Sequence, residues 1–506
     1  MKGNQYRILL IEPPFYRLFN NTYSLDRYPL SLGYLAGTIK KETDWSVMAY
    51  NADFYPQSKP IKVSYLASIG FDNYLSNLKD LSKQVWGEIK STIYEYEPTI
   101  VGISVKSQNL ASACIVAKLA KEVSEQIIVI VGGPHPSMVG SDILNCPDID
   151  IGVKGEGENT IVELLNAIEA GKKFDGIQGI VYRKNSHIVE NIQREFIKDL
   201  DSQCFPHESA PEVLKDYNRY PLSAFKNIFA TRGCPYNCFF CGSRKIWSRK
   251  VRFRSPGNVI REIKGLQRVG LRFIHFDDDT FGINKKYIND LCNALIAHCP
   301  GLKWSCELHV KLVDEKTISL MKAAGCYQIQ IGVESGNNQI LKEMRKNITI
   351  EEALAAAEII KKYGIELQAF FMVGFPQETE DTLNDTVSAM KKIKSDLLIY
   401  SIFTPYPGTE AFEFCKKHGL ISDDYDVSLY NHQSPANCFC INITLERFRI
   451  LVSKIEKMVD RKNSLSRIKR LIFKRLFSGD IAIRKIQELG IGKSFQKIIR
   501  IFIGRK

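Results

Sequence analysis

The first 190 residues alternate short apolar runs with longer stretches of helical periodicity. The apolar runs are rich in Val and Ile and cover residues 7–11, 99–105, 127–131, 150–153 and 179–182. Helical patterns lie between them at residues 30–41, 109–124 and 158–170. Short buried strands separated by helices are typical of a parallel sheet that is covered on both faces. We therefore predict an α/β fold with a doubly wound, flavodoxin- or Rossmann-like parallel sheet over residues 1–190.

A second series of strand and helix patterns follows residues 191–224, where the periodicity fades into the Asp, Ser, Pro and Tyr of a linker. Its strand patterns cover residues 227–231, 273–277, 303–308, 327–332, 367–373 and 397–403, and helical patterns include residues 259–269, 286–297, 315–324 and 379–393. Six βα units fit an open barrel better than a complete barrel of about eight strands. We predict a partial (β/α)6 TIM-type barrel over residues 225–424, with its chemistry at the carboxyl ends of the strands.

The last part of the chain, residues 425–506, has helical patterns and carries most of the net charge. The whole chain has a formal charge of +13, and residues 461–506 hold 14 Lys and Arg against two acidic residues. Residues 468–477 and 491–503 mix Ile, Leu and Phe with these basic residues. We favour a terminal helix packed on the barrel, with peripheral contact to anionic lipid as the alternative. Nucleic-acid binding is not expected, because the basic residues form a tail and the rest is nearly neutral.

Composition sets the broad class. A chain of 506 residues with 44% apolar and 25% charged residues is expected to be globular and to form two or three domains. The start of the chain does not resemble a signal peptide, and the longest aliphatic run is too short to span a bilayer, so we expect a cytoplasmic protein, membrane-peripheral if the tail contacts lipid. Thirteen thinly spread cysteines then indicate free thiols or metal ligands.

Three cysteines lie close together directly after the first barrel strand. The segment TRGCPYNCFFC contains Cys234, Cys238 and Cys241. Such a loop can hold three thiolates around one face of a cubane iron-sulfur cluster and leave the fourth iron open to substrate. The alternative is a zinc site, which needs a fourth ligand. No second CxxC pair or nearby histidine pair supplies one, although Cys438 and Cys440 are distant candidates.

Two later barrel strands end in polar side chains. The segment FDDDTF places Asp277 and Asp278 at the end of the second strand, and GVESGN places Glu334 and Ser335 at the end of the fourth. Carboxylates in these positions can bind an ammonium group or ribose hydroxyls of a cosubstrate. The alternative role of these residues is to cap the helices that follow.

The CxxxCxxC pattern after the first strand of a βα barrel resembles the signature of the radical S-adenosylmethionine superfamily. The resemblance implies a 4Fe-4S cluster on the three cysteines, with S-adenosylmethionine chelated to its open iron. One electron, from a donor such as ferredoxin or flavodoxin, would then release a 5'-deoxyadenosyl radical. The resemblance also implies that Phe240 packs near the adenine and that Glu334 and Ser335 line the cosubstrate pocket.

The N-terminal sheet lacks the GxGxxG fingerprint of dinucleotide-binding proteins after its first strand. Ligands of open sheets bind beyond the carboxyl ends of the strands. The candidate cofactor-binding residues at these ends are Ser104, Ser107, Gly132, Gly133, His135, Gly155, Glu156 and Gly157. With the cysteine motif, the segments PLSLGYLA, GGPHP and GEGE resemble cobalamin-binding radical S-adenosylmethionine enzymes over residues 5–420.

This resemblance implies a cobalamin in the N-terminal domain. None of the eight histidines lies in the Asp-x-His-x-x-Gly context that ligates cobalt from below, so we expect no histidine bond to cobalt. A domain that has lost its corrinoid is the alternative.

The activity that the resemblance implies is methyl transfer to an unactivated carbon of a small-molecule or lipid-like substrate. Radical oxidative cyclisation or rearrangement is the alternative enzyme activity. The non-enzyme alternative is a zinc-containing nucleic-acid-binding protein that uses the cysteine loop and the basic tail.

Overall fold

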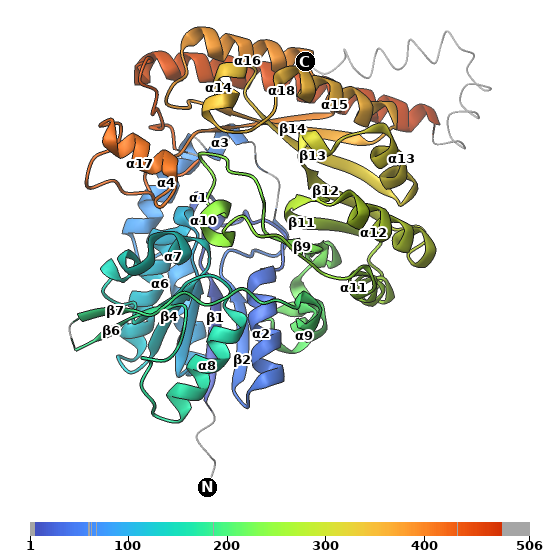
Figure 1. The fold of residues 1–506 in the computed structure, drawn as a ribbon. Coiled ribbons are helices and arrows are strands. Elements are labelled where there is room, and N and C mark those ends of the chain that lie inside the picture. Colours follow the sequence, from blue (N-terminus) through green and yellow to red (C-terminus); the bar gives the residue numbers. More distant parts are fainter. Residues whose placement is uncertain are drawn as a thin grey trace.

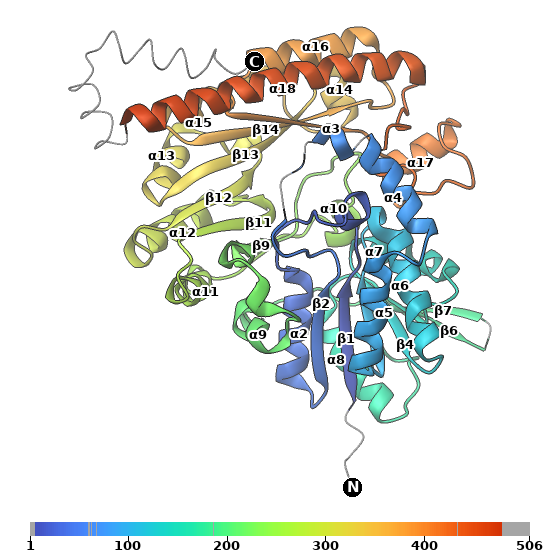
Figure 2. The ribbon, with the colours of Figure 1, turned by 180° about the vertical axis from the view of Figure 1, so that it is seen from behind.

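The computed structural model describes residues 6–58, 61, 63–66, 68–185, 187–432 and 434–477. Two α/β units, each built on its own sheet, make up most of the chain, and a long C-terminal helix crosses the second unit (Figures 1 and 2). No described helix is both long enough and apolar enough to cross a bilayer.

The N-terminal sheet has seven strands in the order β2-β1-β3-β4-β5-β6-β7. Its parallel strands are β1 (Arg7–Glu12), β2 (Ser46–Asn51), β3 (Ile100–Ser104), β4 (Ile128–Gly132) and β5 (Ile151–Val153). This part confirms the predicted doubly wound sheet.

The last two strands, β6 (Ile180–Lys184) and β7 (His187–Glu190), form an antiparallel hairpin on the sheet edge. The prediction that the strand near residues 179–182 is parallel was therefore wrong. Gly179 lies at the carboxyl end of β5, where its carbonyl accepts a 2.7 Å bond from the Lys154 amide. Because the chain has already returned to this end, β6 enters the sheet in the opposite direction.

Helices cover both faces of this sheet. On one face lie α2 (Leu30–Glu42), α8 (Glu158–Glu169) and α9 (Pro206–Val213); on the other lie α5 (Gln84–Tyr96) and α6 (Leu110–Val123). Alternate β1 residues serve the two faces: Ile8 and Leu10 pack on one side, Leu9 and Ile11 on the other. The remaining helices of this unit are α1 (Tyr16–Phe19), α3 (Val63–Leu66), α4 (Ile69–Lys79) and α7 (Pro134–Val139).

The second sheet has six parallel strands in the order β15-β14-β13-β12-β11-β8, and its edge strands β8 and β15 do not pair with each other. The strands are β8 (Asn227–Ile228), β11 (Phe273–Phe281), β12 (Lys303–Leu308), β13 (Cys326–Glu334), β14 (Glu366–Val373) and β15 (Leu397–Ile402). The covering helices are α11 (Pro256–Arg268), α12 (Lys285–His298), α13 (Glu315–Ala323), α14 (Asn338–Glu343), α15 (Ile350–Lys362) and α16 (Glu380–Lys392). This confirms the predicted open barrel.

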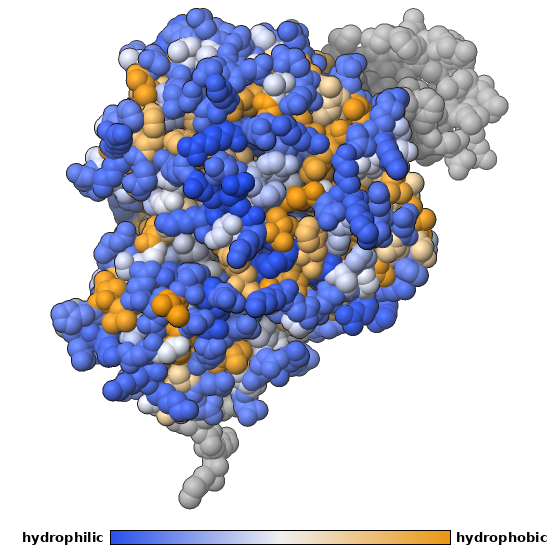
Figure 3. All heavy atoms as spheres, viewed as in Figure 1, coloured by the Kyte–Doolittle hydropathy of each residue, from blue (hydrophilic) through white to orange (hydrophobic). Residues whose placement is uncertain are grey.

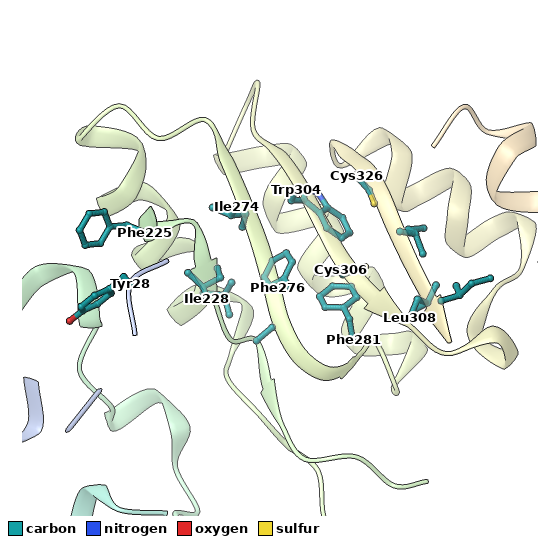
Figure 4. Close-up of a cluster of buried hydrophobic side chains, with 14 of the residues drawn as sticks. Tyr28, Phe225, Ile228, Ile274, Phe276, Phe281, Trp304, Cys306, Leu308 and Cys326 are labelled. Atoms are coloured by element: carbon teal, nitrogen blue, oxygen red, sulfur yellow. The ribbon is translucent and has the colours of Figure 1, made fainter. Parts of the chain in front are cut away.

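The two faces of these strands differ in polarity. Phe276 of β11 and Trp304 of β12 are fully buried and lie together in the core shown in Figure 4. The neighbouring positions His275 and Ser305 are paired in register and joined by a 2.6 Å bond. Because successive strand residues point to opposite faces, the inner face of the barrel receives the polar side chains.

The predicted strand at residues 227–231 splits into β8 and a separate short strand, β9 (Thr231–Arg232). Strand β9 pairs antiparallel with β10 (Arg252–Phe253), and α10 (Ser243–Trp247) lies between them. The cysteine loop is therefore closed at its base by a two-stranded ribbon.

The segment expected to be a linker contains α9, which packs against α2, and Leu214 bridges to Ala49 of β2. The C-terminal helices are α17 (Glu410–Lys417) and α18 (Leu445–Phe477). Phe448 and Ile455 of α18 are buried in the same core as the barrel strands, as expected for a helix packed on the barrel. The predicted segment 491–503 lies outside the described residues, so its lipid contact stays a prediction.

Candidate active site

A cavity of about 480 Å³ lies between the two units, where the carboxyl ends of both sheets meet. Strands β3, β4 and β5 contribute Ser104, Gly132 and Val153 on one side. On the other side, β11 contributes Asp277 and β12 contributes Glu307. Because carboxyl ends are the binding edges of such sheets, this cavity is the candidate active site.

The wall formed by the N-terminal sheet is rich in glycine. A Cβ atom added to Gly132 would have only the Val153 Cβ nearby, at 3.8 Å, so the missing side chain leaves open space in the cavity. Gly133 has a φ of 109°, and an added Cβ would lie 2.9 Å from the Val105 carbonyl oxygen. Gly155 and Gly157 line the same wall. The wall can therefore approach a broad, flat ligand closely.

The loops behind this wall are joined by hydrogen bonds. The Ser137 hydroxyl donates to the Gly133 carbonyl at 2.8 Å and accepts from the Gly155 amide at 2.9 Å. Ser107 Oγ lies 2.9 Å from His135 Nδ1, and neither residue is among the described residues that line the cavity. Burial lowers the pKa of His135 to about 4, so its imidazole is neutral near pH 7. The predicted cofactor contacts of Ser107 and His135 stay predictions.

Two carboxylates of β11 hold the chain that leads into the cysteine loop. Asp278 is buried and accepts hydrogen bonds from the Ala230 amide at 2.8 Å and the Thr231 hydroxyl at 2.7 Å. Asp279 accepts from the Gly233 amide at 3.3 Å. Burial raises the pKa of Asp278 to about 7. Asp278 thus anchors the strand before the first cysteine, besides lining the cavity.

The inner barrel face presents two further acids to the cavity. Asp277 is paired with Arg27 from the N-terminal unit. The pKa of Glu307 is raised to about 7 by burial first, and then by the charges of Asp277 and Asp279. Sequence analysis missed Glu307 and Arg27, because each is a single charged residue in an ordinary segment and the fold alone brings them together.

The three cysteines of the motif are free thiols. Cys234 Sγ lies 3.6 Å from the Thr280 hydroxyl, and Cys241 is exposed. A second hollow is lined by Cys238 and Cys241 together with basic side chains. Three soft thiolate donors suit an iron-sulfur cluster, so the residues present fit the group implied by the motif.

A largely buried ion pair, with side chains 12% and 13% exposed, lies beside this loop. Lys346 Nζ donates to Glu334 Oε1 at 2.8 Å, and Glu334 has a φ of 67° at a register shift of β13. Such a φ is uncommon for a residue with a side chain, and here it coincides with the register shift between β13 and β14. The charges of Glu334, Cys238 and Cys241 raise the pKa of Lys346 against the effect of its burial. Lys346 is therefore a candidate site residue. Sequence analysis missed it because it does not lie at the end of a predicted strand.

The other two predicted cosubstrate residues, Ser335 and Phe240, contact other protein side chains. Ser335 is fully buried, with its hydroxyl 3.2 Å from that of Thr386, and accepts from the Asn337 amide at 3.1 Å. The N-cap of α14 is Asn337, whose side chain accepts from two backbone amides of the helix, so Ser335 supports the turn before the helix and does not cap it. Phe240 is half-buried against an apolar cluster that includes Phe375. Contacts of Ser335 and Phe240 with a cosubstrate stay predictions.

Glu156 lines the cavity, but its carboxylate is already bound by the protein. It accepts bonds of 2.7 Å from Arg232 and Arg252 and of 2.8 Å from the Ile197 amide. Its neighbour Glu158 accepts from Arg232 at 2.7 Å. The GEGE segment therefore joins the N-terminal unit to the base of the cysteine loop.

The fold and the site define the class: a glycine-walled α/β domain faces an open βα barrel that carries three thiols. Models of two protein families match the chain, the radical SAM superfamily over residues 228–390 and the B12 binding domain over residues 17–165.

Relatives and solved structures agree with these matches. The chain is 30% identical over 424 residues to an "uncharacterized methyltransferase" of Pyrococcus horikoshii, covering 82% of this chain and 84% of that protein. It is 30% identical over 396 residues to the anaerobic magnesium-protoporphyrin IX monomethyl ester cyclase of Rubrivivax gelatinosus, covering 74% and 69%. The fold matches TsrM from Kitasatospora setae, a radical S-adenosylmethionine methyltransferase solved with cobalamin and an iron-sulfur cluster, with a TM-score of 0.66, 16% identity and coverage of 90% and 89%.

The chain therefore belongs to the cobalamin-binding radical S-adenosylmethionine enzymes. Its cofactors are a 4Fe-4S cluster, S-adenosylmethionine and cobalamin. Membership in this enzyme family rules out the non-enzyme interpretation of the cysteine loop as a zinc site. The expectation that the chain does not bind nucleic acid stays a prediction.

Proposed function

We propose that the enzyme transfers a methyl group to an unactivated carbon of a small-molecule substrate bound in the interdomain cavity. The observation that carries this proposal is the cavity itself, because one space is lined by the glycine wall of the B12 domain and by the carboxyl ends of the barrel strands. A substrate held there contacts both units at once. The relative from Pyrococcus horikoshii is called a methyltransferase, which supports the same reaction.

When bound, the cluster with S-adenosylmethionine supplies a radical that abstracts hydrogen, and the cobalamin supplies the methyl group. The protein itself binds, orients and encloses the reactants. Cys234, Cys238 and Cys241 would hold the cluster, and the wall around Gly132 would support the corrin. Glu307, with a pKa near 7, can accept or donate a hydrogen bond to a polar group of the substrate at neutral pH.

Radical cyclisation is a second candidate function. It is supported by the 30% identity to the cyclase of Rubrivivax gelatinosus, which the chain matches over 69% of that protein's length. The two reactions differ in product mass, because methylation adds a CH2 unit and cyclisation does not.

The decisive experiment uses protein purified and reconstituted without oxygen. It is incubated with a reductant, hydroxocobalamin, an extract of its own source and S-adenosylmethionine carrying a CD3 group, so that the labelled cosubstrate supplies the methyl group, and the products are analysed by mass spectrometry. We expect a product that gains a labelled methyl group only with the intact enzyme. The matched control replaces all three motif cysteines by alanine. Products that lose hydrogen without gaining the label would instead establish cyclisation.

We further propose that an acidic one-electron donor, such as a flavodoxin or ferredoxin, docks over the second hollow. Cys238 and Cys241 line this hollow together with three basic residues, Arg244, Lys245 and Arg249, and one acid, Glu410, which is paired with Arg244. The lining keeps a net positive charge. Strongly hydrophilic side chains gather near the centre of the face in Figure 3, the region where Figure 1 shows α10. Complementary charge steers such transient partners and makes their association sensitive to salt.

This docking site is tested by charge reversal at two exposed residues of the same loop, Arg249→Glu with Lys250→Glu. We expect at least about tenfold slower 5'-deoxyadenosine formation with reduced flavodoxin, and an unchanged rate with dithionite. Lys264→Glu with Arg268→Glu, on the exposed side of α11, is the matched control. Equal slowing in both double variants would contradict docking at the hollow.

A further inference from the structure

The base of the cysteine loop carries two arginines at directly opposed positions. Arg232 of β9 and Arg252 of β10 are cross-strand partners in the antiparallel ribbon that closes the loop. Like charges placed opposite each other in a ribbon repel. Both side chains are largely buried, at 11% and 14% exposure, so solvent does not screen this repulsion well. The ribbon needs compensating negative charge.

That charge comes from the other unit. Glu156 accepts 2.7 Å bonds from both arginines, and Glu158 accepts one of 2.7 Å from Arg232. Two carboxylates thus balance two guanidinium groups. Aromatic rings enclose the network: the Arg232 guanidinium lies 5.0 Å from the centre of the Tyr34 ring, and that of Arg252 lies 5.6 Å from a ring of Trp247.

The same residues also face the cavity. Glu156, Glu158, Arg232, Tyr34 and Trp247 all line it. Glu156 follows Gly155 of the glycine wall directly, and Glu158 is the first residue of α8. Arg232 precedes Cys234 by two residues. Breaking the ion pairs of this network would leave buried charge without a partner, which is costly. A displacement of the glycine wall is therefore transmitted to the cluster loop through them.

We propose that Glu156, Glu158 and Arg232 are positioning residues that couple occupancy of the cobalamin wall to the geometry of the cluster loop. The proposal rests on the two-cofactor site described above. It means that each cofactor binds more tightly when the other is present, because the first to bind orders the residues that the second contacts. It also means that the network sets the separation of the two cofactors.

The test measures the dissociation constant of hydroxocobalamin for cluster-loaded protein and for protein stripped of iron by a chelator. We expect the cluster-loaded wild type to bind at least about 5-fold more tightly. In Glu158→Gln, which keeps the shape of the side chain but loses its charge, the ratio should fall toward one. A direct effect of the substitution on cobalamin affinity changes both dissociation constants by the same factor, so it cancels in their ratio.

Glu156→Gln is the second variant, and Glu158→Gln remains informative if that variant folds poorly. The matched control is Lys361→Gln, which breaks a partly buried ion pair with Asp396 at 2.5 Å, before β14. The control should keep the wild-type ratio. A second readout is the EPR spectrum of the reduced cluster in the presence of cob(II)alamin, because the magnetic interaction between the two depends on their separation. The features due to this interaction should broaden in the two glutamate variants and not in the control.

A wild-type ratio of one, or an unchanged ratio and spectrum in both glutamate variants, would overturn the coupling. Neither measurement requires turnover. A failure to detect methylation would therefore leave the coupling testable, and a failure of the coupling would leave the proposed reaction untouched.

Discussion

Glu378 is a buried carboxyl group that must carry a proton at neutral pH. Its Oε2 accepts from the Gly374 amide at 2.5 Å and the Phe375 amide at 3.0 Å, while Oε1 is buried with no hydrogen-bond partner among the described residues. Burial is the largest influence and raises its pKa from 4.5 to about 8, against the two amide bonds. Between these two values the folded protein binds more protons than the unfolded chain.

Stability should therefore fall as pH rises from about 4.5 to about 8 through this residue. Glu378→Gln cannot ionise, so we expect its thermal midpoint to lose this part of the pH dependence and to exceed that of the wild type at pH 9. Midpoints measured from pH 5 to pH 9 test this. Glu380→Gln, at an exposed pair with Arg447, should track the wild type. Parallel curves for wild type and Glu378→Gln would contradict a protonated Glu378.

Lys346 offers a second prediction for a single residue. Replacement by methionine removes the positive charge beside the thiols and leaves Glu334 unpaired. We expect the cluster to assemble with about four irons. Its reduction potential should become more negative, and 5'-deoxyadenosine formation should slow by at least about tenfold. Spectroelectrochemical titration measures the reduction potential, and a product assay measures the rate of 5'-deoxyadenosine formation. The exposed Lys342→Met is the control. An unchanged potential would show that Lys346 does not act on the cluster.

Site residues were predictable where the chain alone brings them together. Cys234, Cys238 and Cys241 share one loop, so their spacing carries the chemistry. Lys346 and Arg232 lie in separate segments, and their roles depend on contacts with Glu334 and Glu156 that only the packed fold creates. Sequence reasoning could find a motif, but it could not find such pairs.

Among the elements, the cysteine loop depends on a close approach of backbones at its base. Gly233 has a φ of 104°, and an added Cβ would overlap the carbonyl oxygen of Lys250. Gly233→Ala should therefore distort the loop and lower the iron content of reconstituted protein at least severalfold, since the conformation alone costs about 1–3 kcal/mol for a residue with a side chain. The rest of the barrel should stay folded by circular dichroism.

Gly257→Ala is the matched control for this substitution. Gly257 lies in α11, and nothing stands within 4 Å of an added Cβ. We expect normal iron content and equal or slightly higher stability, because alanine favours the helix. If both variants bound iron normally, the loop would not need glycine at its base.

The fold itself was predictable where apolar runs are strong and continuous. Strands such as β4 and β14 stand out as Val-, Ile- or Phe-rich runs with clear limits. Strand β2 was missed because its apolar run, VMAY, is short and contains one β-branched residue, and because its first three residues are only half-buried. The hairpin β6–β7 was misjudged because strand direction depends on where the preceding segment returns, which local pattern does not encode.

At the scale of the whole molecule, the arrangement separates two chemical tasks between two units. The barrel holds the cluster loop, whereas the N-terminal sheet supplies the wall on which a flat ligand fits. The two tasks meet in the shared cavity and in the Glu156–Arg232 network that borders it. A substitution in the glycine wall that leaves this network in place should therefore remove one task and largely keep the other.

Gly132→Leu tests this separation. The Cβ position is free of backbone contacts, so the sheet can accept the substitution, but the side chain would fill the space beside Val153 in the cavity wall. We expect normal iron content and cosubstrate-dependent 5'-deoxyadenosine formation within about twofold of wild type, with cobalamin retention and product methylation both reduced at least about tenfold. Gly87→Leu, with nothing within 4 Å of an added Cβ, is the matched control. If Gly132→Leu kept its cobalamin, the corrin would bind elsewhere. If the variant lost 5'-deoxyadenosine formation together with methylation, the two tasks could not be separated.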